Sequence, residues 1–162
     1  MKYAVFICIL LVGTCGFANG AEKNTNKVEG FKSDSPIYDS DYSTFLKLVQ
    51  KSELFDLFQG TGPYTVFVPS NAAFEKYGQR KINNLLKDKN RDELINLITY
   101  HIVPGEYLSK YMKSQSIKTI NGKALEIKVM NGEITVNGAK LLKKDREGPN
   151  GALHEIDQVL SP

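Results

Sequence analysis

Residues 64–74, YTVFVPSNAAF, are the place in the chain where a strand suited to full burial runs directly into a helix start. The side chains of Thr65–Val68 are β-branched or aromatic, as in strands that are covered on both faces. Pro69 has no N–H to donate to a neighbouring strand, so the strand is predicted to stop there. Ser70 or Asn71 can then accept hydrogen bonds from the first turn of a short helix. The stretch therefore predicts a central strand followed by a capped helix.

A catalytic role for Ser70 is the alternative to a helix cap. The residue lacks the Gly-x-Ser-x-Gly elbow that presents a nucleophile. Serine catalysis also needs a histidine and an acid beside the hydroxyl, and Ser70, His101 and Asp157 satisfy only the residue types. The sequence therefore favours the cap and predicts that the protein is not an enzyme.

Two short helices are expected before the central strand. Asp39 or Asp41 is placed to cap the first, and Ser52 is placed to cap the second, which ends at Gly60. Helical spacing predicts that the first buries Tyr42, Phe45, Leu46 and Val49 and that the second buries Leu54, Phe55, Leu57 and Phe58.

Two further helices are expected after the central strand. The first buries Ile82, Leu85 and Leu86, and its basic residues Arg80, Lys81 and Lys87 are interpreted as a solvated face. Asn90 and Glu93 resemble a capping box for the second, which packs through Leu94, Leu97 and Ile98. Pro104-Gly105 then forces a turn, and a short helical segment is expected around residues 108–112.

The pattern changes to that of a β-meander after residue 118. Asn121-Gly122, Asn131-Gly132 and Asn137-Gly138 predict three hairpin turns of type I′, because Asn and Gly both tolerate a positive φ. Between them, Leu125, Ile127 and Val129 alternate with polar residues, as in a sheet with one covered face. A polar loop over residues 143–149 and a last strand over Ala152–Asp157 follow. Helices segregated from an antiparallel meander predict an α+β fold.

The N-terminal residues have the character of an export signal. One cation, Lys2, precedes an apolar run over residues 4–12 that is too short to span a membrane. Residues 1–20 are predicted to be removed before Ala21, and lipidation at Cys15 is the alternative. Residues 21–36 are polar and predicted to form a flexible leader, and one domain is expected over residues 37–161.

The amino-acid composition limits which classes of ligand the protein is expected to bind. The chain has 21 Lys and Arg against 18 Asp and Glu, without a long basic run, so nucleic acid is not expected as a partner. Both cysteines, Cys8 and Cys15, lie in the predicted signal, and the only histidines are His101 and His154. Both histidines are interpreted as buried and structural, so no metal or other cofactor is predicted.

Three separated motifs together resemble the fasciclin domain, a secreted adhesion module. They are TVFVPSNAAF at residues 65–74, YHIVPG at residues 100–105 and NGALHEIDQVL at residues 150–160. The resemblance implies a wedge or sandwich of mostly antiparallel strands flanked by several short helices. It also implies an exported protein that binds other proteins or matrix. The signature residues with an implied structural role are Thr65, Phe67, Pro69, Asn71, Phe74, Pro104, Gly105, Gly151, His154 and Asp157.

Two places are implied as partner contacts. One is Tyr100-His101, which is either a contact site or a scaffold element, and the scaffold is the simpler interpretation. The other is the loop with Lys144, Asp145 and Arg146. Animal members of the family carry an Asn-Lys-Asp-Ile integrin motif there, whereas this chain has Lys143-Lys144-Asp145-Arg146, so integrin binding is not carried over.

The expected function is therefore non-catalytic binding of extracellular or cell-surface proteins or matrix glycans, without a membrane span. The alternative is a small apolar, glycan or lipid ligand held in a groove between the helices and the sheet.

Overall fold

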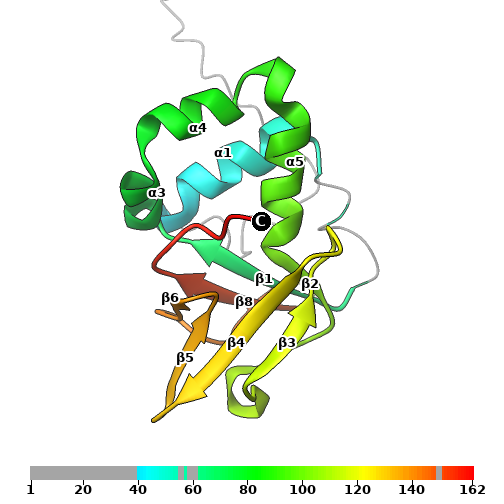
Figure 1. Ribbon diagram of the computed structural model, residues 1–162, viewed down its shortest axis with the longest axis vertical. Coiled ribbons are helices and arrows are strands. Elements are labelled where there is room, and N and C mark those ends of the chain that lie inside the picture. The colour runs from blue at the N-terminus through cyan, green and yellow to red at the C-terminus, as the bar shows by residue number, and fades with distance from the viewer. Residues whose placement is uncertain (1–39, 55–56, 58–61, 149–150) are drawn as a thin grey trace, which may run out of the picture.

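The computed structural model describes residues 40–54, 57, 62–148 and 151–162. The predicted signal, the leader and most of the second predicted helix lie outside these residues. The described chain stacks a helix layer on a first sheet, sheet A, and a second sheet, sheet B, below it (Figure 1). The helices are η2 (Ser40–Tyr42), α1 (Ser43–Ser52), α3 (Asn71–Tyr77), α4 (Gln79–Leu85), η3 (Asp88–Asn90), α5 (Arg91–Tyr100) and η4 (Ser109–Tyr111).

Each sheet has four strands among the described residues. Sheet A has the order β2-β1-β8-β7, with β2 Ile102–Pro104, β1 Tyr64–Pro69, β8 Gly151–Ile156 and β7 Arg146–Gly148. Sheet B has the order β3-β4-β5-β6, with β3 Gln115–Lys118, β4 Ala124–Met130, β5 Glu133–Val136 and β6 Ala139–Lys140. All pairs are antiparallel except β1 with β8. The α+β prediction is therefore confirmed.

The predicted central strand is β1, which lies between β2 and β8. Its parallel register with β8 runs from Tyr64 opposite Gly151 to Pro69 opposite Ile156. Both faces of β1 are covered, as the β-branched and aromatic sequence predicts. Val66 and Val68 face the helix layer, and Phe67 faces sheet B. One strand therefore contributes to two hydrophobic cores.

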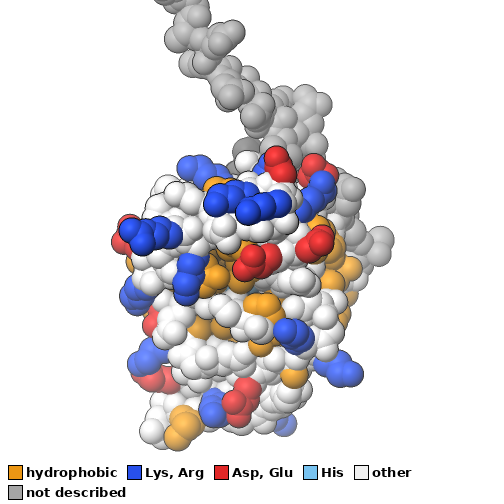
Figure 2. Space-filling model, turned by 45° about the horizontal axis from the view of Figure 1, so that its top comes forward, with side chains coloured by type: hydrophobic (Ala, Val, Ile, Leu, Met, Phe, Trp, Pro, Cys, Tyr) orange, Lys and Arg blue, Asp and Glu red, His pale blue; other side chains and the backbone are white. Residues whose placement is uncertain are grey.

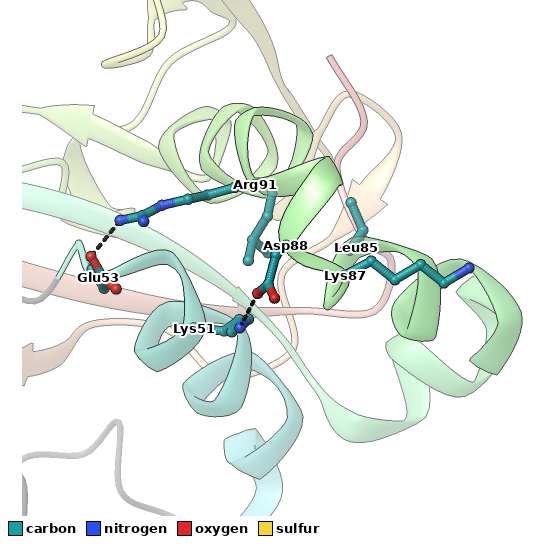
Figure 3. Close-up of a pocket in the computed structure, with 7 residues that line it drawn as sticks. Lys51, Glu53, Leu85, Lys87, Asp88 and Arg91 are labelled. Carbon is teal, nitrogen blue, oxygen red and sulfur yellow. Dashed lines mark hydrogen bonds and ion pairs between the residues drawn. The ribbon is translucent and has the colours of Figure 1, made fainter.

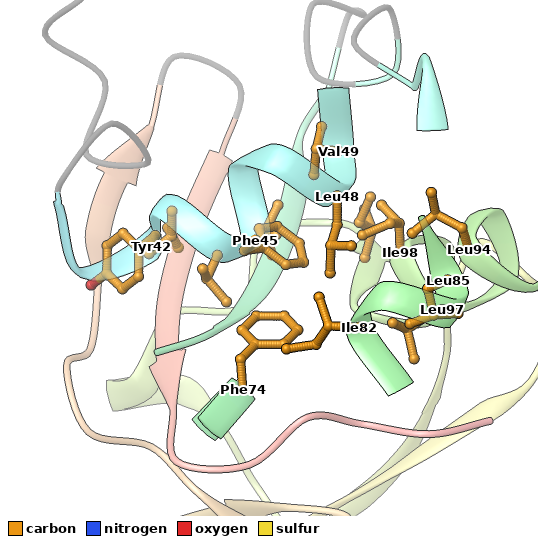
Figure 4. Packing of buried hydrophobic residues seen from close by; sticks show 14 residues of the cluster. Tyr42, Phe45, Leu48, Val49, Phe74, Ile82, Leu85, Leu94, Leu97 and Ile98 are labelled. Atoms are coloured by element: carbon orange, nitrogen blue, oxygen red, sulfur yellow. The ribbon is translucent and has the colours of Figure 1, made fainter. Parts of the chain in front are cut away.

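The first core lies between the helices and sheet A. Figure 4 shows Phe45 and Leu48 of α1 pointing toward Phe74 and Ile82, with Leu94, Leu97 and Ile98 of α5 beside them. The second core lies between the two sheets and includes Leu125, Ile127, Ile134 and Val136. Leu48 was not predicted to be buried, whereas Leu46, which was, is only partly covered. The other predicted inward residues of the helices among the described residues are buried or partly buried.

The predicted caps of α1, α3 and α5 can be compared with the structure, and two of the three differ; the helix that Ser52 is predicted to cap lies mostly outside the described residues. The Ser70 hydroxyl accepts from the Ala73 N–H at 3.2 Å, so this predicted cap is confirmed. Of the two alternatives for the first helix, the cap at Asp41 is wrong, because α1 begins without a local side-chain cap, and Asp39 lies outside the described residues. The predicted capping box at α5 is also wrong, because the Asn90 amide donates to the Asn84 carbonyl at 2.8 Å instead. A side-chain amide with a nearby carbonyl has a competing partner that the sequence does not reveal.

Asn71 supplies the missing cap of α1 from a distant part of the chain. Its Oδ1 accepts from the Thr44 N–H at 3.1 Å, and its Nδ2 donates to the Ser40 carbonyl at 2.8 Å. The first turn of a helix has N–H groups without partners in the helix, and Asn71 satisfies one of them. Asn71, the first residue of α3, therefore helps to fix where α1 begins.

Two of the three predicted hairpin turns are confirmed. Asn131-Gly132 and Asn137-Gly138 have positive φ at both positions and connect β4 to β5 and β5 to β6. Asn121-Gly122 is not a type I′ turn, because only Gly122 has a positive φ there. The predicted polar loop over residues 143–149 is also shorter than expected, because its residues 146–148 form β7. These residues pair with β8 and so cannot be a free loop.

Candidate interaction surface

His101 is enclosed where α5 passes into β2. Its side chain is 0% exposed. The Nε2 atom accepts from the Leu160 N–H at 3.0 Å, so this nitrogen carries no proton, and Nδ1–H donates to the Leu97 carbonyl at 2.8 Å. Burial lowers the pKa of His101 to about 4, against the opposing effect of the Leu97 hydrogen bond. His101 is therefore a neutral connection between α5 and the C-terminal segment.

Tyr100 connects α5 to sheet B. Its hydroxyl donates to the Ala124 carbonyl at 3.1 Å and accepts from Asn137 Nδ2 at 2.7 Å. Asn137 also accepts from the Glu126 N–H at 2.7 Å, so one network holds the helix, β4 and the turn after β5. The ring is 5% exposed. Both residues of the Tyr100-His101 motif thus direct their side chains into the molecule.

The second histidine, His154, is held in a similar way beside the 143–146 segment. Its ring stacks on Phe67 with centroids 5.7 Å apart, Nε2–H donates to the Tyr107 carbonyl at 2.7 Å, and Nδ1 accepts from the Asp145 N–H at 3.2 Å. Burial lowers the pKa of His154, although the bond to Tyr107 and the charge of Asp145 oppose the shift. The imidazole is predicted to face inward from the sequence, and it does.

The Asp145 side chain is exposed to solvent, but hydrogen bonds hold it in one conformation. Its carboxylate accepts from the Ser109 N–H at 2.6 Å and from the Ser109 hydroxyl, and its backbone has a positive φ of 54°. Burial raises the pKa of Asp145, but the hydrogen bonds from Ser109 outweigh this effect and leave it below the ordinary value. Together with the bond to His154, these contacts hold the loop on η4.

Arg146 and Lys143 flank a buried carboxylate that sequence analysis did not identify. Glu155 is 5% exposed and accepts from the Tyr42 hydroxyl at 2.8 Å and from Lys143 at 3.1 Å. Arg146 donates to the same hydroxyl at 3.2 Å, and Lys143 also pairs with Asp41 at 2.8 Å. Burial, followed by the bond to Glu155, raises the pKa of Tyr42.

This cluster joins the start of the helix layer to β8. The sequence does contain a signal for it, since Glu155 is the one charged residue in an otherwise buried strand. Lys144, by contrast, is exposed and donates to the Gly132 carbonyl at 3.4 Å.

The signature residues mostly hold β1 in place. The Thr65 hydroxyl donates to the Gly105 carbonyl and accepts from the Tyr107 N–H, both at 2.8 Å. Gly151 packs so closely on β1 that an added Cβ would lie 1.9 Å from the Tyr64 carbonyl oxygen. Asp157 accepts from the Lys140 N–H at 2.7 Å and so links the two sheets. Phe67 and Phe74 are buried, and Pro69 and Pro104 are the last residues of their strands.

The three residue types of a serine triad have separate partners. Ser70 caps α3, His101 contacts Leu97 and Leu160, and Asp157 contacts Lys140. No hydrogen bond given for the described residues joins any two of them. Within the same residues, no group of three or more His, Cys, Asp and Glu side chains is placed to hold a metal ion, and no helix is long and apolar enough to cross a membrane.

A charged hollow of about 200 Å³ lies where α1 ends and α5 begins. Figure 3 shows its two ion pairs, Lys51 with Asp88 at 2.5 Å and Arg91 with Glu53. The Lys51 hydrogen bond lowers the pKa of Asp88. Because each acid already has a cation across the hollow, the pairs connect helices and leave little charge for a ligand. Exposed ion pairs of this kind contribute little to stability.

Comparisons with known proteins agree on one family. A model of the fasciclin domain matches residues 40–162. Protein sll1483 of Synechocystis sp. is 36% identical over 121 residues, which cover 75% of this chain and 67% of that protein. Periostin of Homo sapiens is 34% identical over 127 residues, which cover 76% of this chain but only 15% of periostin.

The fold has a counterpart among solved structures. A FAS1 domain pair from the insect cell adhesion molecule fasciclin I superposes with a TM-score of 0.62 at 21% identity, covering 76% of this chain and 46% of that chain. Because the family model spans all but the first 39 residues, the chain belongs to the fasciclin domain family.

Proposed function

We propose that the protein is a non-catalytic interaction module that binds extracellular or cell-surface proteins or matrix through the surface around Lys144, Asp145 and Arg146. The observation that carries this proposal is the fixed conformation of an exposed, charged loop. Asp145 is held by Ser109 on one side and by His154 on the other. A loop that is already ordered loses less conformational entropy when a partner binds.

Relatives support a role at the cell surface. One of them, from Mycobacterium bovis, is named a cell surface glycolipoprotein, and the solved structure with the same fold comes from a cell adhesion molecule. We propose accordingly that the protein is exported, with cleavage before Ala21 or lipidation at Cys15 as the two routes. The mass of the N-terminal peptide from the native protein distinguishes these routes.

Tyr100 and His101 are assigned a scaffold role in this proposal. Their side chains are enclosed and bonded to α5, sheet B and the C-terminal segment, so they support the surface from inside. Among the residues that the structure describes, no observation favours the alternative of a small ligand in a groove between the helices and the sheet. The charged hollow described above lies at helix ends, and a shallow groove lined by Ser114, Ser116 and Lys128 lies on sheet B.

The test is retention of surface proteins and matrix by the immobilised protein and its variants. Lys144→Glu reverses an exposed charge in the loop, and Lys81→Glu is the matched control on α4, where the side chain is also exposed. We expect Lys144→Glu to reduce retention severalfold while Lys81→Glu leaves it unchanged. Equal retention by all three proteins, with equal melting temperatures, would show that the loop is not the contact surface.

A further inference from the structure

Two large apolar side chains are exposed at the end of the molecule that lies away from the helices. Tyr111 on η4 is 70% exposed, and Met130 at the end of β4 is 68% exposed. Figure 1 places the turn between β4 and β5 and the short η4 helix at the lower end of the longest axis. Figure 2 also shows hydrophobic surface beside charged side chains at this end. Exposed apolar residues that lie together on a surface mark a contact with another body.

Hydrogen bonds connect the segments that carry these residues. Lys144 reaches from its loop to the Gly132 carbonyl in the β4–β5 turn, and Asp145 in the same loop accepts from Ser109 of η4. Ser114, just after η4, accepts from the Val129 N–H at 2.9 Å. We call the combined area, residues 109–114, 129–133 and 144–145, the tip surface. Hydrogen bonds thus hold its three segments together.

The tip surface carries three exposed lysines. Lys110, Lys113 and Lys144 are exposed, and none forms a salt bridge with a residue that the structure describes. The Lys110 ammonium lies 4.7 Å from the centre of the Tyr111 ring. The area also holds two acids: Glu133 pairs with Lys140, and Asp145 accepts from Ser109 while the charge of Lys110 helps to lower its pKa.

We propose that the tip surface docks peripherally on an anionic lipid membrane. This inference goes beyond the proposed protein binding and does not depend on it, although Lys144 and Asp145 belong to both surfaces. Tyrosine rings partition into the interfacial region of a bilayer, and lysine side chains place their ammonium groups among lipid phosphates while their stems stay in apolar surroundings. Apolar side chains together with a cluster of cations provide the two signals that stable membrane binding requires.

Around Tyr111 and Met130, the shape of the tip surface favours lipid over a protein partner. Tyr111 lies on the short helix η4 and Met130 at the end of β4, and both side chains are mostly exposed; Met130 also borders the shallow groove on sheet B. A protein interface gains most of its affinity from side chains enclosed in well-packed pockets. A fluid bilayer, by contrast, closes around projecting side chains without a matching pocket.

A tryptophan reporter tests the contact directly, because the chain contains no tryptophan. In Tyr111→Trp, we expect the emission to shift to shorter wavelength with vesicles of equimolar phosphatidylglycerol and phosphatidylcholine, and not with phosphatidylcholine alone. Lys81→Trp, in which an exposed lysine near Tyr77 on the helix layer is replaced, is the matched control and should not shift. Absence of a shift in Tyr111→Trp, or an equal shift in both variants, overturns the proposal.

Vesicle sedimentation tests the charges and the second apolar residue. Lys110→Glu with Lys113→Glu should weaken binding by more than about tenfold, and Met130→Ser should weaken it severalfold. Arg80→Glu with Lys81→Glu makes the same charge change on α4 and should have a much smaller effect. Unchanged binding in the tip variants overturns the proposal. The same holds if these variants lose retention of a surface protein while the parent does not bind vesicles, since the tip would then be a protein contact.

Discussion

His101 closes the contact between α5 and the C-terminal segment, so its loss should weaken the whole domain. In His101→Ala, the Leu160 N–H and the Leu97 carbonyl lose their buried partner. We expect the free energy of unfolding to fall by about 1–3 kcal/mol in urea denaturation. A variant that unfolds like the parent but loses partner retention would show instead that the motif is a contact site. Lys81→Ala is the exposed control and should change little.

The same residue should make stability depend on pH. The unfolded chain binds a proton at the ordinary pKa of 6.5, whereas folded His101 does so near 4. Between these values the unfolded state binds more protons, so stability is full above pH 6.5 and is lost as the pH falls toward 4. His101 accounts for about 3 kcal/mol of this loss, and His154 acts in the same direction because its pKa is also lowered.

Urea denaturation across this pH interval is the measurement. The slope of unfolding free energy against pH should be clearly smaller in His101→Ala than in the parent. A slope that the substitution leaves unchanged would mean that other groups cause the acid loss. The lowered pKa of Asp145 acts only at more acidic pH, because stability from a carboxylate is lost as the pH falls below its ordinary value of 3.8.

At the scale of elements, α1 depends on a residue outside it. Asn71→Ala removes the acceptor for the Thr44 N–H and the donor to the Ser40 carbonyl. We expect a loss of about 1–2 kcal/mol and faster amide exchange in the first turn of α1. Asn71→Asp keeps the acceptor beside the helix N-terminus and should retain most of the stability. Equal losses in both variants would contradict the capping role.

The parallel pair of β1 and β8 should not tolerate a side chain at its start. Gly151 has a φ of 140°, and an added Cβ would meet the backbone of Tyr64. Gly151→Ala is therefore expected to prevent folding or to lower the melting temperature by more than any surface change. Gly122→Ala is the control, because its φ is also positive but no atom lies within 4 Å of the added Cβ. Its cost should be about 1 kcal/mol. Similar melting temperatures for both variants would contradict the role of close packing.

Local sequence patterns predicted the helices, strands and turns, whereas they did not predict the contacts between residues far apart in the sequence. The β-branched run of β1, the Ser70 cap and two Asn-Gly turns depend on neighbouring residues and were predicted correctly. Asn71 caps α1 from 27 residues away, and Glu155 meets Tyr42 across 113 residues, so neither contact has a local pattern. In the candidate site, the burial of His154 was predicted from the sequence. The fixed conformation of Asp145 was not, since it depends on Ser109 in a separate segment.

At the scale of the whole molecule, the two cores should unfold together. Adjacent residues of β1 face opposite cores, Val66 and Val68 the first and Phe67 the second, so neither core persists without the strand. Leu94→Ala and Leu125→Ala each remove a buried side chain from one core and should each cost about 2–5 kcal/mol. Far-ultraviolet circular dichroism and tyrosine fluorescence should report the same single transition in both variants. Two separated transitions would indicate independent halves.

The parallel pairing of β1 with β8 also has a consequence for the timing of folding. The inner strand β1 pairs with β8, which begins 82 positions after Pro69 in the chain. The His101 side chain likewise needs Leu160, close to the end of the described chain, as its hydrogen-bond donor. A nascent chain that has emerged only as far as β6 has its helices and its meander, but β1 still has one open edge. Such an edge is the kind of surface on which partly folded chains aggregate. The domain thus reaches its native state only when its last residues are available, and until then it stays a substrate for chaperones.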